Sequence, residues 1–278
     1  MSIKKERVDV LLVEQGLCET REKAKRAIMA GLVYTPDERI DKPGVKIEVD
    51  TPLELKGKVM PYVSRGGLKL EKAIKVFDLK LEDKIVLDIG ASTGGFTDCS
   101  LQNGAKLVYA LDVGYNQLAW KLRQDERVVV MERTNFRYVT PDDLTHGLPN
   151  FSTIDVSFIS LKLILPVLKT ILASGGDIVC LVKPQFEAGK DEVGKKGIVR
   201  EKKIHSKVLE DIIHFASEIG YSIKNASFSP ITGGEGNIEF LLHLIWNGDN
   251  EEQQSSAIDV TEIVQDAHKT LKENHEKG

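Results

Sequence analysis

The stretch Ile85-Val-Leu-Asp-Ile-Gly-Ala-Ser-Thr-Gly-Gly-Phe-Thr97 decides the fold of this 278-residue chain. Its apolar, β-branched start predicts a buried strand, and the glycines that follow predict a turn that opens a helix. Residues without a side chain let the backbone approach a ligand closely and leave amides at the helix start free. The spacing is neither Gly-x-Gly-x-x-Gly nor a phosphate loop ending in Lys-Ser or Lys-Thr. We therefore expect a nucleotide-like ligand that is bound without pyrophosphate features.

The residues that follow predict a parallel sheet. The next strand ends in Asp112, about 20 residues after the glycine turn, where an acidic side chain binds the hydroxyls of an adenosine ribose. Two late runs, 221–230 and 237–246, lie close enough in sequence to form an antiparallel pair that closes the sheet. The apolar runs alternate with helical segments, as in a doubly wound sheet, and they span residues 85–90, 107–113, 127–132, 152–158 and 177–182. The pattern indicates an α/β class I (Rossmann-like) methyltransferase fold with a seven-stranded sheet.

Polar residues stand at the ends of the later strands. Asp155 follows the fourth strand and Lys183 follows the fifth. In a doubly wound sheet both ends face the crevice that holds the ligand, so an acid and a lysine meet there. Asn135, after the third strand, is placed to hydrogen-bond an adenine edge, although a simple turn explains it equally well.

The first 55 or so residues predict a small α+β unit of their own. Val8, Leu11 and Leu12 have helical spacing, and Gly16 is a typical helix end. Thr20 predicts the start of a second helix, which ends near Gly31. Short β-prone pieces follow at 32–35, 45–49 and 52–55. This order of elements resembles the RNA-binding module that is named after a small-subunit ribosomal protein.

Charge is distributed unevenly along the chain. The net charge is −4, yet residues 1–75 carry +4 and residues 247–278 carry −5. The front of the chain is therefore the expected place for a polyanion to dock. A second basic segment, 188–203, is rich in Gly and Lys, and it predicts either a disordered surface loop or a flexible basic flap over RNA phosphates.

Several classes of protein are disfavoured by composition. Cys18, Cys99 and Cys180 are far apart and odd in number, so we expect reduced, buried thiols and no metal site. The N-terminus does not read as a signal peptide, and no apolar run approaches the ~18 residues of a membrane span. We expect a cytoplasmic protein with no stable membrane association.

The motifs together are similar to one family. They resemble, from about residue 5 to residue 245, the TlyA family of hemolysin A-type ribosomal RNA methyltransferases, whose catalytic domain is of the FtsJ type. The matching stretches are VSRGGLKL (63–70), DIGASTGGFTD (88–98), ALDVGYNQLAW (110–120), ERTN (132–135), DVSFISL (155–161), LVKPQFEAGK (181–190) and GNIEF (236–240).

The resemblance implies a reaction and a set of catalytic residues. FtsJ-type enzymes carry a Lys-Asp-Lys-Glu set, which falls here on Lys69, Asp155, Lys183 and Glu239. It also implies S-adenosyl-L-methionine as methyl donor, a ribose 2′-hydroxyl of a cytidine as acceptor, and ribosomal RNA in ribosomal subunits, not DNA, as partner. Two neighbouring lysines depress each other's pKa, whereas the two acids oppose that effect. The sequence leaves open which effect is larger.

The expected binding residues and domains follow from the same motifs. The predicted cofactor-binding residues are Asp88, Gly90, Ala91, Ser92, Thr93, Gly94, Gly95, Phe96, Asp112, Val113 and Asn135. The predicted RNA-binding residues are Arg7, Arg21, Lys25, Arg26, Arg65, Lys190, Lys195, Lys196 and Arg200. The predicted domains are an RNA-binding unit (1–59), a linker (60–67) that the glycine pair at 66–67 makes mobile, a methyltransferase domain (68–246), and an acidic flexible linker with a short helix (247–278).

Three other functions remain open from sequence. The first is a membrane-active toxin, because members of the family carry the name hemolysin. The lack of a membrane-length apolar segment disfavours it. A non-catalytic RNA-binding protein with a methyltransferase fold is disfavoured by the complete set of four residues. A DNA or protein methyltransferase shares the fold, but it usually carries an aromatic Pro-Pro-Tyr-like motif where this chain has Asp155-Val-Ser-Phe158.

Overall fold

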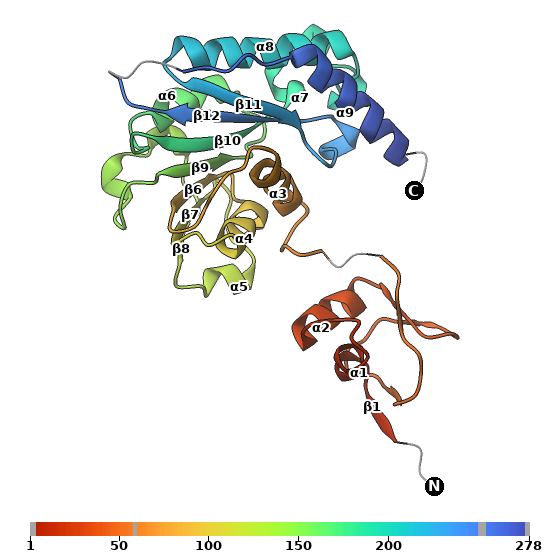
Figure 1. Ribbon diagram of the computed structural model, residues 1–278. Coiled ribbons are helices and arrows are strands. Elements are labelled where there is room, and N and C mark those ends of the chain that lie inside the picture. Colours follow the sequence, from red (N-terminus) through yellow and green to blue (C-terminus); the bar gives the residue numbers. More distant parts are fainter. Residues whose placement is uncertain (1–3, 58–59, 250–253, 276–278) are drawn as a thin grey trace. The chain divides into compact units, whose positions relative to one another are not determined.

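The computed structural model describes residues 4–57, 60–249 and 254–275, the last four by their backbone alone. The chain divides into two compact units, Met1–Pro61 and Tyr62–Gly278. Each unit has its own buried apolar core. Figure 1 shows the two units and the elements of each.

The first unit packs two helices on short strands. Helix α1 (Val8–Glu14) and helix α2 (Arg21–Met29) bury Leu11, Leu12 and Ile28 between them and the strands. The Thr20 hydroxyl accepts a hydrogen bond from the Lys23 amide and caps α2, as the sequence predicts. The strands form one two-stranded and one three-stranded sheet, and they are β1 (Lys5–Arg7), β2 (Val33–Tyr34), β3 (Arg39–Ile40), β4 (Lys46–Glu48) and β5 (Glu54–Leu55). The predicted small α+β unit is confirmed.

The second unit is built on a seven-stranded sheet in the order β11-β12-β10-β9-β6-β7-β8. All neighbours from β10 to β8 pair in parallel, whereas β12 runs antiparallel to both β10 and β11. The predicted fold class is therefore confirmed, including the late antiparallel pair. The strands are β6 (Ile85–Ile89), β7 (Leu107–Leu111), β8 (Val128–Met131), β9 (Phe151–Ile154), β10 (Gly176–Val182), β11 (Ser222–Phe228) and β12 (Phe240–Trp246).

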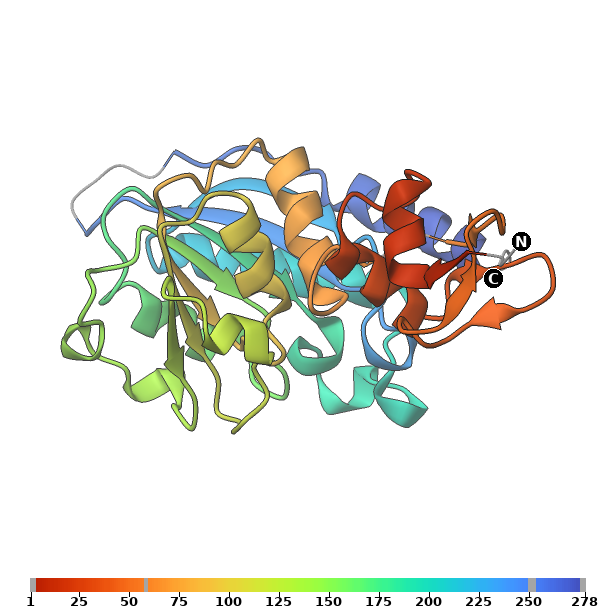
Figure 2. The ribbon, with the colours of Figure 1, turned by 90° about the horizontal axis from the view of Figure 1, so that it is seen from below.

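Helices cover both faces of this sheet (Figures 1 and 2). Successive strand residues point to opposite faces, so Val86 packs with α3, α4 and α5 while Leu87 packs with α6, α8 and α9. The helices are α3 (Gly66–Val76), α4 (Gly95–Gln102), α5 (Trp120–Arg123), α6 (Leu165–Leu168), α7 (Pro184–Glu187), α8 (Lys202–Glu218) and α9 (Val260–His275). The 3-10 turns are η1 (Phe136–Tyr138), η2 (Pro141–Asp143), η3 (Leu161–Leu163), η4 (Lys190–Glu192), η5 (Lys195–Gly197) and η6 (Gly234–Gly236).

The start of the second unit is fixed to it by side-chain contacts. The Tyr62 hydroxyl donates to Glu71, and the Val63 amide donates to Asp98 of α4. Gly67 lies under the Tyr62 ring, where a Cβ atom would come within 2.3 Å of the ring. Gly67 of the predicted linker therefore lets the Tyr62 ring pack at the start of α3.

The C-terminal segment is also attached to the sheet. Residues 247–257 predict a flexible acidic linker, of which 250–253 lie outside the described residues. The Ser256 amide donates to the Ile223 carbonyl of β11, and the Ile223 amide donates to the Ser255 hydroxyl. Val264 and Ala267 of α9 are buried in the core. Within residues 4–57, 60–249 and 254–275, no helix has the length and apolar character needed to cross a membrane.

Candidate active site

The site lies at the edge of the sheet where the parallel strands end. Ile89 at the end of β6 pairs with Ile154 at the end of β9, so the next residues, Gly90 and Asp155, are neighbours. Val182 of β10 pairs with Phe240, the first residue of the antiparallel strand β12. Because β12 is reversed, its beginning lies at the same edge as the end of β10. The sheet thus brings the regions of Asp155, Lys183 and Glu239 together.

Gly90 joins the glycine turn to the strand that carries Asp155. Its φ angle is +86°, and a Cβ atom there would lie 2.6 Å from the Asp155 carbonyl oxygen. A side chain at this position would therefore push the two strand ends apart. The closeness fixes the turn against the base of Asp155.

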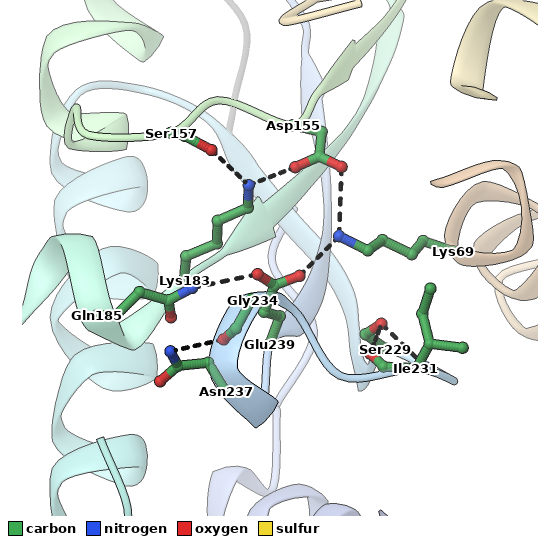
Figure 3. A network of polar contacts seen from close by, with 10 residues as sticks. All are labelled: Lys69, Asp155, Ser157, Lys183, Gln185, Ser229, Ile231, Gly234, Asn237 and Glu239. Carbon is green, nitrogen blue, oxygen red and sulfur yellow. Dashed lines mark hydrogen bonds and ion pairs between the residues drawn. The ribbon is translucent and has the colours of Figure 1, made fainter. Parts of the chain in front are cut away.

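The four residues of the Lys-Asp-Lys-Glu set form one ionic network (Figure 3). The Lys183 Nζ lies 2.5 Å from Asp155 Oδ1, and the Lys69 Nζ lies 3.3 Å from Asp155 Oδ2. Lys69 Nζ also lies 2.7 Å from Glu239 Oε2. Each lysine side chain is 9% exposed. Asp155 therefore sits between two ammonium groups, and Lys69 sits between two carboxylates.

The charges of the network stabilise one another. Burial acts to lower the pKa of Lys69, but attraction to Asp155 and Glu239 outweighs it and the pKa is raised. Burial acts to raise the pKa of Asp155, but Lys69 and Lys183 outweigh it and the pKa is lowered. The sequence leaves open whether the neighbouring lysine or the two acids have the larger effect on the pKa of Lys69, and in the structure the effect of the acids is larger. Lys69 and Asp155 are therefore held in their charged forms.

A pocket of about 470 Å³ opens beside this network. Two of the four residues, Lys69 and Asp155, line it, together with the exposed Arg65. A loop that contains Gly233 also lines it, and a Cβ atom on Gly233 would lie 2.1 Å from Glu239 Oε1. The full lining is Ser64, Arg65, Gly66, Lys69, Gly90, Ala91, Ser92, Thr93, Gly95, Phe96, Asp155, Ile231, Thr232, Gly233 and Gly234. Most of the predicted glycine-turn residues therefore face one cavity.

The other predicted cofactor residues lie outside this lining. Asp112 ends β7, and its carboxylate accepts hydrogen bonds from the amides of Ser92 at 2.8 Å and Gly114 at 2.7 Å. It is thereby tied directly to the glycine turn. Asn135 caps the turn η1 and accepts from the Arg137 amide, and Val113 is exposed.

Asp88 is buried beneath the glycine turn rather than open to the pocket. Its two carboxylate oxygens accept hydrogen bonds from Thr97 of α4 at 2.7 Å and Thr153 of β9 at 2.9 Å. Burial raises the pKa of Asp88 to about 7, although the two threonine hydrogen bonds oppose the shift. Asp88 therefore links three elements that surround the pocket.

The predicted RNA-binding residues differ in how free they are. Arg7 and Arg21 both form ion pairs with Asp9, and Lys25 pairs with Glu22 at 2.8 Å. Arg26 is half-buried. The remaining five are exposed, and they are Arg65, Lys190, Lys195, Lys196 and Arg200.

The basic segment 188–203 is held at its far end. The Val199 amide donates to Asn237 Oδ1 at 3.1 Å, and Asn237 Nδ2 donates to the Gly197 carbonyl at 3.0 Å. Asn237 lies two residues before Glu239. The segment, which carries four of these predicted cations, is thus hydrogen-bonded to a residue that directly precedes the strand end bearing Glu239.

Sequence reasoning missed three residues around the network. Ser157 Oγ accepts from Lys183 at 3.3 Å, and Gln185 Nε2 donates to Glu239 Oε1 at 3.2 Å. Phe158 is 90% exposed, with a φ angle of +63° that is rare for a bulky residue, and its ring packs on Phe186. Each lies within three residues of Asp155 or Lys183, which is the only signal that the sequence offers.

Comparisons with known proteins agree with this geometry. The FtsJ-like methyltransferase family matches residues 62–246, and the S4 domain matches residues 6–51. Bacillus subtilis YqxC, named as an rRNA methyltransferase, is 67% identical over 98% of this chain and 98% of that protein. Mycobacterium tuberculosis TlyA, named 16S/23S rRNA (cytidine-2′-O)-methyltransferase, is 41% identical over 86% of this chain and 89% of that protein. The solved structure of a Streptococcus thermophilus protein named as a hemolysin has 60% identity and a TM-score of 0.75, covering 99% of this chain and 100% of its own.

Proposed function

We propose that this chain, which belongs to the FtsJ-like methyltransferase family, transfers a methyl group from S-adenosyl-L-methionine to a ribose 2′-hydroxyl of ribosomal RNA. The family membership agrees with the resemblance that the motifs indicate. One observation carries the proposal: the Lys69, Asp155, Lys183 and Glu239 network lies beside the pocket that the glycine turn lines.

The pocket suits S-adenosyl-L-methionine. The glycine turn at 90–95 exposes backbone at the start of α4, and the Asp112 carboxylate lies next to it at the end of the neighbouring strand. When bound, S-adenosyl-L-methionine supplies a methyl group that its sulfonium sulfur already activates. We assign the turn to the body of this molecule, and Asp112, Val113 and Asn135 to its adenosine.

The network's own task is to orient and deprotonate a poor nucleophile. Lys69 is held between two carboxylates, so its charge is fixed and it positions Asp155 and Glu239. Lys183 has one carboxylate and one hydroxyl as partners. We assign to Lys183 the contact with the ribose hydroxyl, which it orients and whose proton it receives or passes on as the oxygen bonds to carbon.

The acceptor we propose is a cytidine in the RNA of ribosomal subunits. Support comes from the S4 domain match at residues 6–51 and from the name of the Mycobacterium tuberculosis relative. Arg65 at the pocket and the exposed cations of segment 188–203 add positive charge for the RNA backbone.

The test is methyl transfer from labelled S-adenosyl-L-methionine to unmethylated ribosomal subunits, free ribosomal RNA, DNA and protein. We expect label in ribosomal RNA, at a 2′-O-methylated cytidine, and loss of that label with Lys183→Ala. Label in DNA or protein alone would overturn the substrate assignment. Cofactor-independent lysis of red cells by the purified protein, with no label in RNA, would instead favour a membrane-active toxin.

A further inference from the structure

A buried carboxylate in the first unit holds two of the arginines that the sequence assigns to RNA. Asp9 lies in the first turn of α1, and its side chain is 0% exposed. Burying an unpaired carboxylate is costly, so this position needs a compensating partner. It has two, one before the helix and one from the next helix.

Arg7 binds Asp9 through two nitrogens of its guanidinium. Its Nε donates to Asp9 Oδ1 at 2.8 Å, and a terminal nitrogen donates to Oδ2 at 3.1 Å. Arg21, the first residue of α2, donates to Oδ2 at 2.9 Å. The pKa of Asp9 is lowered to about 2, because the hydrogen bond from Arg7, supported by Arg21, outweighs burial. Asp9 is therefore charged at neutral pH and fixes both guanidinium groups.

The two arginines keep a free side. Their side chains are 39% and 53% exposed, whereas Asp9 is covered. A guanidinium has five N–H donors, and Asp9 takes two from Arg7 and one from Arg21. The cluster thus presents toward solvent two planar guanidinium groups that Asp9 fixes in place. Its net charge is positive, because two guanidinium groups face one carboxylate.

We propose that Asp9 is a positioning residue that holds Arg7 and Arg21 as a single pre-formed binding site for an RNA phosphate. This inference rests on the proposed RNA substrate. Planar guanidinium groups bind phosphate through paired hydrogen bonds, and holding them in place before binding avoids the entropy of ordering two long side chains.

A charge argument and a geometric argument predict opposite results for Asp9→Asn. If the arginines acted only through charge, removing a negative group beside them would tighten RNA binding. If Asp9 positions them, the neutral amide releases two side chains, and binding weakens although the unit becomes more positive. Glu14→Gln is the matched control, because Glu14 is exposed on the same helix and the substitution changes the net charge equally.

The experiment measures binding of the full-length chain to a fluorescent, structured ribosomal RNA transcript at several salt concentrations. We expect Asp9→Asn to weaken binding about tenfold and Glu14→Gln to leave it unchanged or tighter. Methylation kinetics should show the same split, with KM for RNA raised by Asp9→Asn and kcat retained. Asp9→Asn binding as tightly as Glu14→Gln would overturn the inference.

A second variant guards against loss of folding. If thermal unfolding shows that Asp9→Asn disrupts the first unit, the double variant Arg7→Lys, Arg21→Lys decides, because it keeps both charges and removes the planar forks. Weaker binding by that variant supports the inference, and equal binding overturns it. A wild-type chain that binds no RNA would overturn the proposed function along with this inference, whereas a wild type that binds and an Asp9 variant that binds equally would leave the function intact.

Discussion

Of the two lysines in the network, Lys183 has fewer acidic partners. It contacts one carboxylate, that of Asp155, while Lys69 contacts two. We expect Lys183→Ala to lower methyl transfer by about 10²–10⁴-fold, because orientation and proton removal are both lost. Binding of S-adenosyl-L-methionine, measured by calorimetry, should be retained, since Lys183 is outside the lining of the pocket. Near-normal turnover in this variant would contradict the role.

Asp88 gives the protein a pH dependence whose sign can be stated. Its pKa is about 7 in the folded chain, well above the ordinary carboxyl value near 4. At Asp88 the folded state therefore binds more protons between these two values, so the contribution of Asp88 to the free energy of unfolding falls as the pH rises from about 4 to 7. We expect Asp88→Asn to remove about 2–4 kcal/mol of this decline, measured by chemical denaturation across that range. Parallel curves for the two proteins would show that Asp88 does not titrate there.

The sequence predicts the four network residues but not which lysine pairs with which carboxylate. Short motifs place Lys69, Asp155, Lys183 and Glu239 at element ends, and the structure brings all four together. That Lys69 bridges Glu239, 170 residues away, depends on strand order and register, which no local pattern encodes. The ion pairs of Arg7 and Arg21 with Asp9 were missed for the same reason, because charge counts do not show which charges are neutralised.

At the scale of elements, local periodicity in the sequence predicts strands but not their order in the sheet. The sequence predicts an antiparallel pair at the end of the sheet, and the pair is confirmed. It does not predict that β12 inserts between β10 and β11. This insertion places Glu239 opposite the end of β10, so the last member of the set depends on it.

The loop after β9 presents Phe158 to solvent at the edge of the site. Its 90% exposure and left-handed φ angle are unfavourable for an isolated protein, so we expect a role in contact with substrate. Stacking of a base on this ring would contribute about 1–3 kcal/mol. Phe158→Ala should lower kcat/KM for RNA about tenfold or more, with unchanged unfolding temperature and cofactor affinity. Unchanged kinetics would remove Phe158 from the RNA surface.

The four predicted RNA-binding cations of segment 188–203 are exposed, and Asn237 anchors the backbone of that segment. We expect simultaneous replacement of Lys190, Lys195, Lys196 and Arg200 by Gln to weaken RNA binding and to flatten its dependence on salt. Each cation that neutralises a phosphate adds close to one counterion to the slope of the salt dependence, about 0.7–0.9. The measurement is RNA affinity over a salt series. An unchanged slope would show that these four side chains do not contact RNA phosphates.

At the scale of the molecule, the proposed cofactor pocket and the proposed arginine site for RNA lie in different units. The four network residues and the pocket lie within Tyr62–Gly278, and the arginine pair lies within Met1–Pro61. We expect a chain of residues 62–278 to fold, to bind S-adenosyl-L-methionine with wild-type affinity, and to methylate RNA with a KM raised about tenfold or more. Wild-type kinetics for this fragment would show that the first unit is not needed for RNA capture.

The late position of Glu239 in the chain bears on how the protein is made. Lys69, Asp155 and Lys183 have all been synthesised before β12 exists, yet Lys69 then lacks one of its two carboxylates. During translation, at about 5–20 residues per second, the glycine turn and strands β6 to β10 are synthesised before the ionic network can close. The four-residue network is therefore incomplete in the nascent chain until β12, which ends at Trp246, has joined the sheet. If all four residues are needed for methyl transfer, a chain that is still being synthesised cannot yet modify the ribosome whose RNA is the proposed substrate.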